Sequence, residues 1–192
     1  MKRLSLPTQE SEIRALKRGD EVLLSGRLIT GRDAAHKHLV KTDDAEARRY
    51  LENSVIYHCG PVVVKTPDGG WKVTAAGPTT SSREEPYQAK VIGDYKLRGV
   101  IGKGGMGLKT LEACKKFGCV YLHAIGGLAA TLAAHVKSVD GVLHYEAFGP
   151  PEAMWILNVE DFPAVVTMDS HGESLHEVVA AQSQQRLKAL FG

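Results

Sequence analysis

The chain has 192 residues, of which 24% are charged, with a net charge of +2 and three cysteines. This length fits one domain that buries a core without disulfides or a structural metal. The near-neutral charge argues against nucleic acid as the main partner, because such proteins usually carry a strongly basic surface. The few cysteines, the lack of a long apolar run and an N-terminus without signal-peptide features predict a cytoplasmic protein.

The first half of the chain is rich in β-forming residues. Asp33 is a candidate helix cap, because a side-chain oxygen there can accept a hydrogen bond from the first helical turn. The predicted elements, in chain order, are an extended segment at 4–8, a helix at 10–17, a strand at 21–29 with a bulge at Ser25-Gly26, a helix after Asp33, a helix capped by Thr42 or Asp43 that ends at Tyr50, a strand at 55–64 interrupted by Gly60-Pro61, and a strand at 71–75.

In the second half, predicted strands and helices alternate. In order they are a turn at 77–82, a helix at 86–92, a short strand ending at Ile101, a helix at 108–117 stopped by Gly118, a strand at 119–125, a helix at 128–136, strand candidates at 142–148, 154–159 and 162–168, a turn at 169–172 and a helix at 174–191. Alternation of this kind favours a parallel or mixed sheet. We therefore predict a single α/β domain spanning residues 1–192.

The most distinctive loop is IGKGGMG, at 101–107, which follows a strand and opens a helix. Glycines let the backbone approach a ligand closely, and a helix N-terminus attracts anions. Lys103 adds a full positive charge at the same place. The loop does not match the P-loop, which places its lysine after the last glycine. It predicts a site for a small anion, and a tight turn with a solvated lysine is the structural alternative.

Two further loops have the same form, each linking a strand to a helix and carrying a cation. In the loop at 76–83, four hydroxyl residues precede Arg83, which can bind a carboxylate with two parallel hydrogen bonds. In the loop at 30–36, Arg32 precedes Asp33 and His36. Helix capping in the first and a surface turn in the second are the structural alternatives.

The three cations predict one site. Ligands of α/β sheets collect at the carboxyl ends of the strands, so Arg32, Arg83 and Lys103 are expected to converge on a doubly negative substrate. No metal site is expected in this chain. His36-x-His38 lacks a carboxylate or cysteine at ligand spacing, and the cysteines are best interpreted as core residues. A serine nucleophile elbow, G-x-S-x-G, is absent.

Five segments carry a family resemblance: SGRLITGRDAAHK, IYHCGP, AGPTTSSR, IGKGGMG and EDFPAVVTMDSHG. In this order they resemble the β subunit of class I fumarases and L-tartrate dehydratases, which forms the C-terminal domain in single-chain members. The resemblance covers residues 4–172. It is specific because five motifs occur in register.

The resemblance implies a swivelling β/β/α fold with a mixed sheet and flanking helices. It also implies a larger α subunit, joined in a heterodimer or heterotetramer, whose cysteines hold a [4Fe–4S] cluster with one open iron that acts as a Lewis acid. The active site then lies between the two subunits, and this chain alone is inactive. The implied reaction is the reversible hydration of fumarate to malate, a step of the tricarboxylic acid cycle.

The resemblance also assigns roles to residues. Thr79 matches the catalytic base, and Arg32, Arg83 and Lys103 match the ligands of the substrate carboxylates. The residues alone do not distinguish Thr79 from Thr80 as the base. The supporting loop residues are Gly102, Gly104, Gly105, Thr80, Ser81, Asp33 and His36.

Several alternatives stay open. Dehydration of L-tartrate uses the same chemistry on a substrate with one more hydroxyl, and other unsaturated diacids are compatible with the same cations. A stand-alone anion-binding module and a regulatory subunit are hypotheses of a different class. A surface made for the α subunit predicts homo-oligomers when the chain is isolated.

Overall fold

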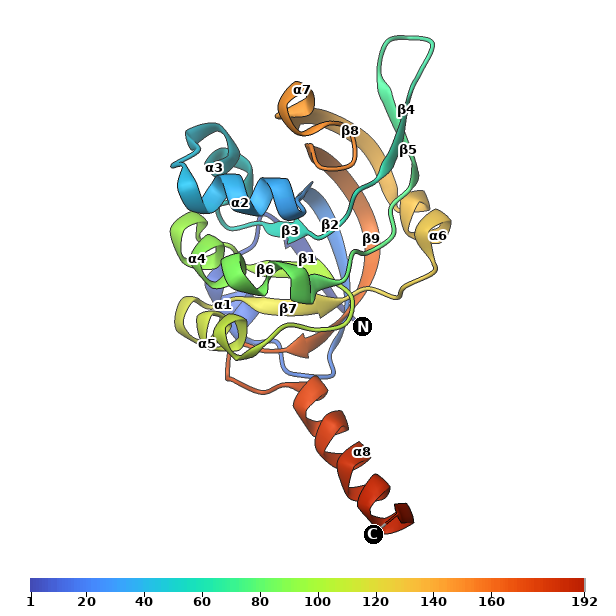
Figure 1. Cartoon of the computed structure of the whole chain (residues 1–192). Coiled ribbons are helices and arrows are strands. Elements are labelled where there is room, and N and C mark those ends of the chain that lie inside the picture. The colour runs from blue at the N-terminus through green and yellow to red at the C-terminus, as the bar shows by residue number, and fades with distance from the viewer. Residues whose placement is uncertain (192) are drawn as a thin grey trace.

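A computed structural model of the chain describes residues 1–191 (Figure 1). Its strands are β1 (Lys2–Leu6), β2 (Glu21–Thr30), β3 (Val55–Tyr57), β4 (Val62–Lys65), β5 (Trp71–Ala75), β6 (Gly99–Gly102), β7 (Val120–His123), β8 (Val136–Leu143) and β9 (Met154–Met168). Its helices are α1 (Glu10–Arg14), α2 (Asp33–Lys41), α3 (Ala45–Leu51), α4 (Glu85–Tyr95), α5 (Leu108–Phe117), α6 (Ala129–Ala134), α7 (Tyr145–Phe148) and α8 (Leu175–Phe191), with a 3₁₀ turn at Ser81–Glu84 before α4.

The main sheet has the strand order β1-β2-β3-β6-β7-β9-β8. β2, β3, β6 and β7 run parallel, and β9 runs antiparallel to its neighbours. β9 also pairs with β2, which closes the ring β2-β3-β6-β7-β9. The pairing of β2 with β9 shifts between Leu24 and Gly26, beside the predicted bulge, but the extra residue lies on β9, between Val159 and Phe162. β2 itself stays in register with β1 through Ser25 and Gly26.

Successive residues of the parallel strands belong to two separate cores, as expected from the period of two in a strand. Tyr57, Ile101 and Leu122 pack in the first core, which also receives side chains from α1 and α6. Their neighbours Ile56 and Val100 pack in the second core, beneath α2 to α5. Full burial of one such apolar side chain contributes about 1.5–3 kcal/mol to stability.

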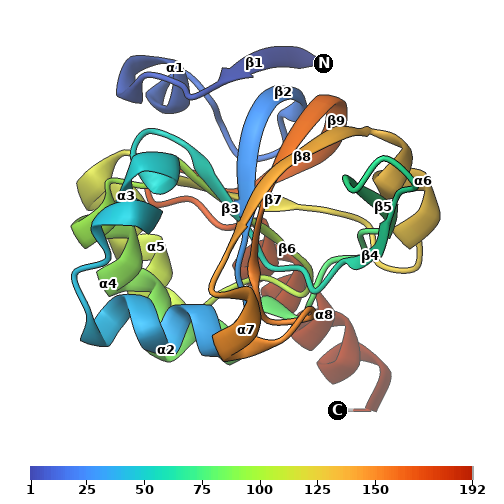
Figure 2. The same ribbon diagram turned by 90° about the horizontal axis from the view of Figure 1, so that it is seen from above.

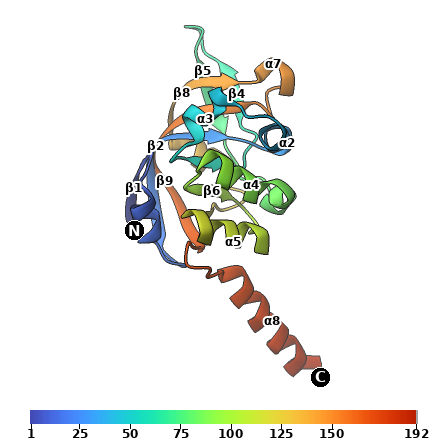
Figure 3. The same cartoon turned by 90° about the vertical axis from the view of Figure 1, so that its left-hand side faces the viewer.

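Two elements extend from this body. The hairpin of β4 and β5 projects at one end, and α8 projects at the other (Figures 1 and 3). Viewed from above, α1 and α2 lie on opposite sides of the sheet (Figure 2). α8 contributes no buried residue. No helix within residues 1–191 combines the length and the apolar character needed to cross a bilayer.

The α/β class, with a mixed sheet and flanking helices, is confirmed. The predicted strand at 142–148 is wrong, because β8 ends at Leu143 and α7 follows it. The strands predicted at 154–159 and 162–168 are one strand, β9, which continues through Asp161 in a left-handed conformation. The cap of α3 is Asp44, rather than Thr42 or Asp43.

Candidate functional site

The carboxyl ends of β2, β3, β6 and β7 lie at one edge of the sheet, which we call the site edge. Arg32 follows β2, His58 follows β3 and Lys103 follows β6. The parallel pairing of these strands therefore brings residues far apart in sequence to adjacent positions. This is the arrangement that favours ligand binding in α/β sheets.

Backbone hydrogen bonds join the hydroxyl-rich loop to the glycine loop. The Thr79 N–H donates to the His58 carbonyl at 2.6 Å, and the Lys103 N–H donates to the Thr79 carbonyl at 3.2 Å. The Ser81 N–H donates to the Lys103 carbonyl at 3.0 Å. Two of the predicted site loops are thus held together at the site edge by an isolated parallel bridge between Thr80 and Lys103.

The cations differ in their partners. Arg83 forms an ion pair with Asp33, and Arg32 Nε lies 3.5 Å from a carboxylate oxygen of Glu152. Lys103 is half-buried beside Gly126 and has no ion-pair partner within residues 1–191. Its ammonium is therefore available to an anion from outside this part of the chain.

The first turn of α2 differs from the prediction. Arg32, rather than Asp33, occupies the N-cap position. Asp33 is the first helical residue, and its carboxylate joins the Arg83 guanidinium. The Ala34 N–H donates to a Glu152 oxygen at 2.9 Å. Asp33 thus connects the loop after β2 to the loop that carries Arg83.

The glycine loop bends sharply, with Gly104 and Gly105 at φ values of 81° and 83°. The N-terminus of α5 was predicted to attract a ligand anion, but it already holds a carboxylate of this chain. Glu85 accepts hydrogen bonds from the N–H groups of Gly107, at 2.8 Å, and Thr110, at 3.3 Å. The favourable position for an anion at this helix end is therefore occupied internally.

A buried hydrogen-bonded network lies behind the site loops. His36 and His58 each place Nε2 within 2.9 Å of the Gln88 amide oxygen. His36 Nδ1 contacts the Arg32 carbonyl at 2.8 Å, and His58 Nδ1 contacts Ser81 Oγ at 2.8 Å. The network links the backbone of the first cation loop to the hydroxyl loop, so it positions both.

Burial sets the charge of this network. Desolvation lowers the pKa of His36 and holds the pKa of His58 well below its usual value, so both rings are neutral at pH 7. With their protons on Nδ1, both rings present an Nε2 lone pair to Gln88. If the Gln88 amide is rotated by 180°, its two N–H groups donate to both lone pairs; in the other orientation they have no hydrogen-bond partner within residues 1–191.

Glu84 borders the same network, fully buried, and neither carboxyl oxygen has a hydrogen-bond partner within residues 1–191. Burial, with a further contribution from the charge of Asp33, raises the pKa of Glu84 to about 7. One oxygen lies 3.6 Å from His36 Nδ1. Glu84 therefore exchanges its proton near neutral pH, one residue away from Arg83.

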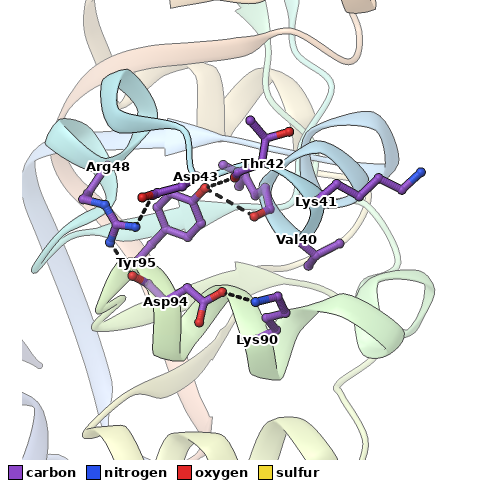
Figure 4. A pocket seen from close by; sticks show the side chains of 9 residues that line it. Val40, Lys41, Thr42, Asp43, Arg48, Lys90, Asp94 and Tyr95 are labelled. Carbon is purple, nitrogen blue, oxygen red and sulfur yellow. Dashed lines mark hydrogen bonds and ion pairs between the residues drawn. The ribbon is translucent and has the colours of Figure 1, made fainter.

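A separate hollow of about 340 Å³ lies between α2, α3 and α4 (Figure 4). Its charged groups largely neutralise one another: Arg48 pairs with Asp43, and Lys90 pairs with Asp94. The Tyr95 hydroxyl donates to backbone carbonyls. This hollow does not offer the concentration of cations that a dicarboxylate requires.

Sequence reasoning missed His58, Glu84, Glu85 and Gln88. Glu84 and Glu85 are typical of the first turn of a helix, where acidic residues are common, and Gln88 is a residue type that usually occupies exposed helix positions. His58 lies in an apolar run that reads as a core strand. A partial signal existed, since a histidine among buried β residues requires a polar partner.

Comparison with known proteins gives a consistent result. The family model described as "Fumarase C-terminus" matches residues 1–179. A Geobacillus stearothermophilus protein, provisionally named fumarate hydratase class I, is 54% identical over 184 residues, which are 96% of this chain and 35% of that protein. The "L(+)-tartrate dehydratase subunit beta" of Escherichia coli K12 is 35% identical over 177 residues, which are 90% of this chain and 85% of that protein. A Methanocaldococcus jannaschii protein, provisionally given the same subunit name, is 39% identical and is covered to 95%.

Proposed function

The chain belongs to the fumarase C-terminus family, and from this membership we propose that it is the beta subunit of a [4Fe–4S] hydro-lyase that interconverts fumarate and malate. The relatives named "subunit beta" imply a partner, and we propose a cluster-bearing α subunit in that place. The observation that carries the proposal is the pair of backbone hydrogen bonds that joins the Thr79 loop to Lys103 at the site edge.

The three cysteines of this chain do not fit a cluster. Cys59 lies in the first core, whereas Cys114 and Cys119 lie in the second, and all three are buried. Burial raises the pKa of Cys59 to about 12, which opposes the thiolate that iron ligation needs. The proposal therefore assigns the cluster to the partner and assigns substrate binding to this chain.

In the proposed site, Arg32, Arg83 and Lys103 bind the two carboxylates of the substrate. Each charge-assisted hydrogen bond contributes about 1.5–3 kcal/mol. Arg83 and Arg32 are held in place by Asp33 and Glu152, so their orientation is fixed before the substrate arrives. Lys103 is not paired within residues 1–191, and it stabilises the negative charge that develops on a carboxylate during proton removal.

Thr79 is the proposed base. It is half-buried, whereas Thr80 is exposed, and its backbone is fixed on both sides by His58 and Lys103. An alcohol is a weak base, so its alkoxide requires nearby positive charge, and Lys103 on the adjacent loop is the candidate to supply it. As an alkoxide, Thr79 Oγ takes the proton from the carbon next to the substrate carboxylate.

Two alternatives are separated by observations. Dehydration of L-tartrate is the second candidate, because the relatives covered at 95% and 85% carry that name. We favour fumarate because the relative with that name has the higher identity, 54% against 39% and 35%. A phosphate-binding module is disfavoured, because Glu85 occupies the helix N-terminus where the phosphate would lie.

The test is anaerobic reconstitution with the cluster-bearing α subunit from the same source, with each subunit alone as a control. Turnover in the mixture alone, faster with fumarate than with L-tartrate, is expected. No turnover of either diacid, with an intact cluster and a verified complex, would contradict the proposal.

Matched variants then test the residues. Thr79→Val is expected to lower kcat by about 100-fold or more, the usual contribution of a general base, whereas Thr80→Val leaves it nearly unchanged. Lys103→Met is expected to lower kcat/KM by about 10- to 100-fold, whereas Lys109→Met, at an exposed position of α5, has little effect. Equal effects of the two threonine variants would refute the role of Thr79.

A further inference from the structure

Two imidazoles and a carboxylate meet at the edge of the helical layer, outside the proposed substrate site. His38 lies on α2, Asp44 caps α3 and His144 directly precedes α7, 100 residues after Asp44. One Asp44 oxygen, Oδ2, lies 3.0 Å from His38 Nε2 and 2.7 Å from His144 Nε2. All three atoms lie within 4.8 Å of one another.

Backbone hydrogen bonds hold the carboxylate of Asp44 through the oxygen that faces away from the histidines. Its other oxygen, Oδ1, accepts hydrogen bonds from the N–H groups of Glu46, at 3.1 Å, and Ala47, at 2.9 Å. Its own N–H donates to the Tyr95 hydroxyl at 3.1 Å. Oδ2 is therefore aimed at the two histidines by contacts that orient a metal ligand in the same way in known sites.

His144 is placed at a conformational cost. Its φ of 58° and ψ of 27° are left-handed, which is uncommon for a residue other than glycine. Strain of this kind often accompanies functional placement. The two imidazole rings lie 4.6 Å apart, and the Phe148 ring packs against both, at 5.6 and 4.9 Å. The ligand atoms thus have an apolar neighbour that limits access of water on one side.

We propose that His38, Asp44 and His144 bind a divalent transition-metal ion, for which Zn²⁺ is the reference. Two imidazole nitrogens and one carboxylate oxygen form a ligand set that zinc accepts, with water in the fourth position. Ligands about 2.0–2.2 Å from the ion would lie a little over 3 Å apart. The two distances from Asp44 Oδ2, 3.0 and 2.7 Å, need only a small increase, and the two imidazole Nε2 atoms lie within 4.8 Å of each other. Without metal, the same atoms are held by hydrogen bonds to Oδ2.

Such an ion joins α2 to the segment between β8 and β9. The same two segments meet again where Arg32 pairs with Glu152. Figures 2 and 3 both show α7 beside α2. The bound metal would therefore stabilise the contact between the segment that contains Glu152 and α2, the helix capped by Arg32. Metal binding itself does not depend on the proposed hydro-lyase activity.

The sequence did not reveal this site. His36-x-His38 offered no carboxylate at ligand spacing, and His36 is turned inward, where it contacts Gln88. The remaining ligand, His144, lies in a segment that the sequence predicted to be a strand. The fold supplies both missing ligands by bringing α3 and α7 to the exposed end of His38.

The experiment uses the full chain, stripped of metal with a chelator and titrated with Zn²⁺ by calorimetry, with the metal content measured after equilibrium dialysis. One ion per chain and a higher Tm with Zn²⁺ are expected. His38→Ala and His144→Ala are each expected to weaken Zn²⁺ binding by at least about tenfold. His171→Ala, an exposed histidine distant in sequence from the cluster, is the control and should bind as the wild type does.

Two results would overturn the proposal: a wild-type chain that binds less than one Zn²⁺ at 100 μM free metal, or cluster variants that bind as tightly as His171→Ala. Far-UV circular dichroism verifies that each variant is folded. If an alanine variant unfolds, His38→Gln and His144→Gln retain a polar group and replace it in the same comparison.

Discussion

Replacing Glu84 by glutamine is expected to change how the stability of the fold depends on pH. Glu84 is fully buried beside His36, and its pKa is raised from 4.5 to about 7 by burial and by the charge of Asp33. Glutamine has nearly the same shape and does not ionise. The substitution therefore removes a titration while preserving the packing.

The magnitude follows from the two protonation states. The unfolded chain releases this proton near pH 4.5, whereas the folded chain keeps it until about pH 7. Between these values the folded state binds more protons, so its stability falls as the pH rises. A pKa difference of this size corresponds to about 3 kcal/mol. Glu84→Gln should therefore gain about 3 kcal/mol relative to wild type between pH 4.5 and 8.

The assay is urea unfolding followed by circular dichroism at intervals across that pH range, for wild type, Glu84→Gln and the exposed control Glu112→Gln. His36 and His58 change the stability in the opposite direction. Their pKa values are lowered in the folded state, so the folded protein loses stability as the pH falls below 6.5. The contribution of His58 cancels in the difference, because it is present in every protein compared, whereas a change in the His36 titration would report its contact with Glu84.

A difference that stays flat, or that falls as the pH rises, would refute the reasoning. It would mean that Glu84 is ionised in the folded protein and paired with a protonated His36, 3.6 Å away. The control should follow the wild-type curve throughout.

Three further changes test other features. Gly102→Ala places a new methyl group 1.8 Å from Ser81 Oγ, so a loss of about 1–3 kcal/mol is expected in urea unfolding; unchanged stability would contradict the close packing of the two loops. Glu85→Ala removes the carboxylate that caps α5 and should cost about 0.5–2 kcal/mol, measured as a lower Tm; an unchanged Tm would show that the cap is dispensable. Ending the chain at Ala180 deletes the exposed side chains of α8 at 181–191 and should change stability by less than about 0.5 kcal/mol; a larger loss would mean that the projecting helix supports the body.

The fold was predictable where local signals agreed. The strand Trp71–Ala75 and the helix Leu108–Phe117 match the prediction to the residue, the latter because Gly118 ends it in a left-handed conformation. The strand predicted at 142–148 failed because α7 is a single turn whose apolar residues also fit an alternating pattern. The break predicted near Asp161 failed because β9 passes through it, with the Asp161 N–H bonded to Ser25 Oγ on β2. That bond joins residues 136 positions apart in the chain, so the sequence around Asp161 does not indicate it.

The candidate site was predictable as a set of loops but not as a network. Lys103 and Arg83 stand out because charge occurs beside turn-forming residues at strand ends. The buried positions of Glu84 and Gln88 arise from the packing of α4 against α2 and α5, which depends on contacts across the chain. Asp33 was predicted to cap α2, but in the structure it pairs with Arg83. The sequence could not indicate this partner, because it lies 50 residues away.

The closing pair of the ring, β2 with β9, has a consequence for how the chain acquires its structure during synthesis. β2 ends at Thr30, and β9 begins at Met154. The ring therefore cannot close until on the order of a hundred further residues have been made, and such long-range pairing is intrinsically slow. Loops at the site edge depend on β2, β3 and β6 being in register. We expect nascent chains that stop before Met154 to expose apolar strand faces, and therefore to need chaperones or be degraded. Synthesis of β9, the last strand, then determines whether the first half of the chain escapes degradation.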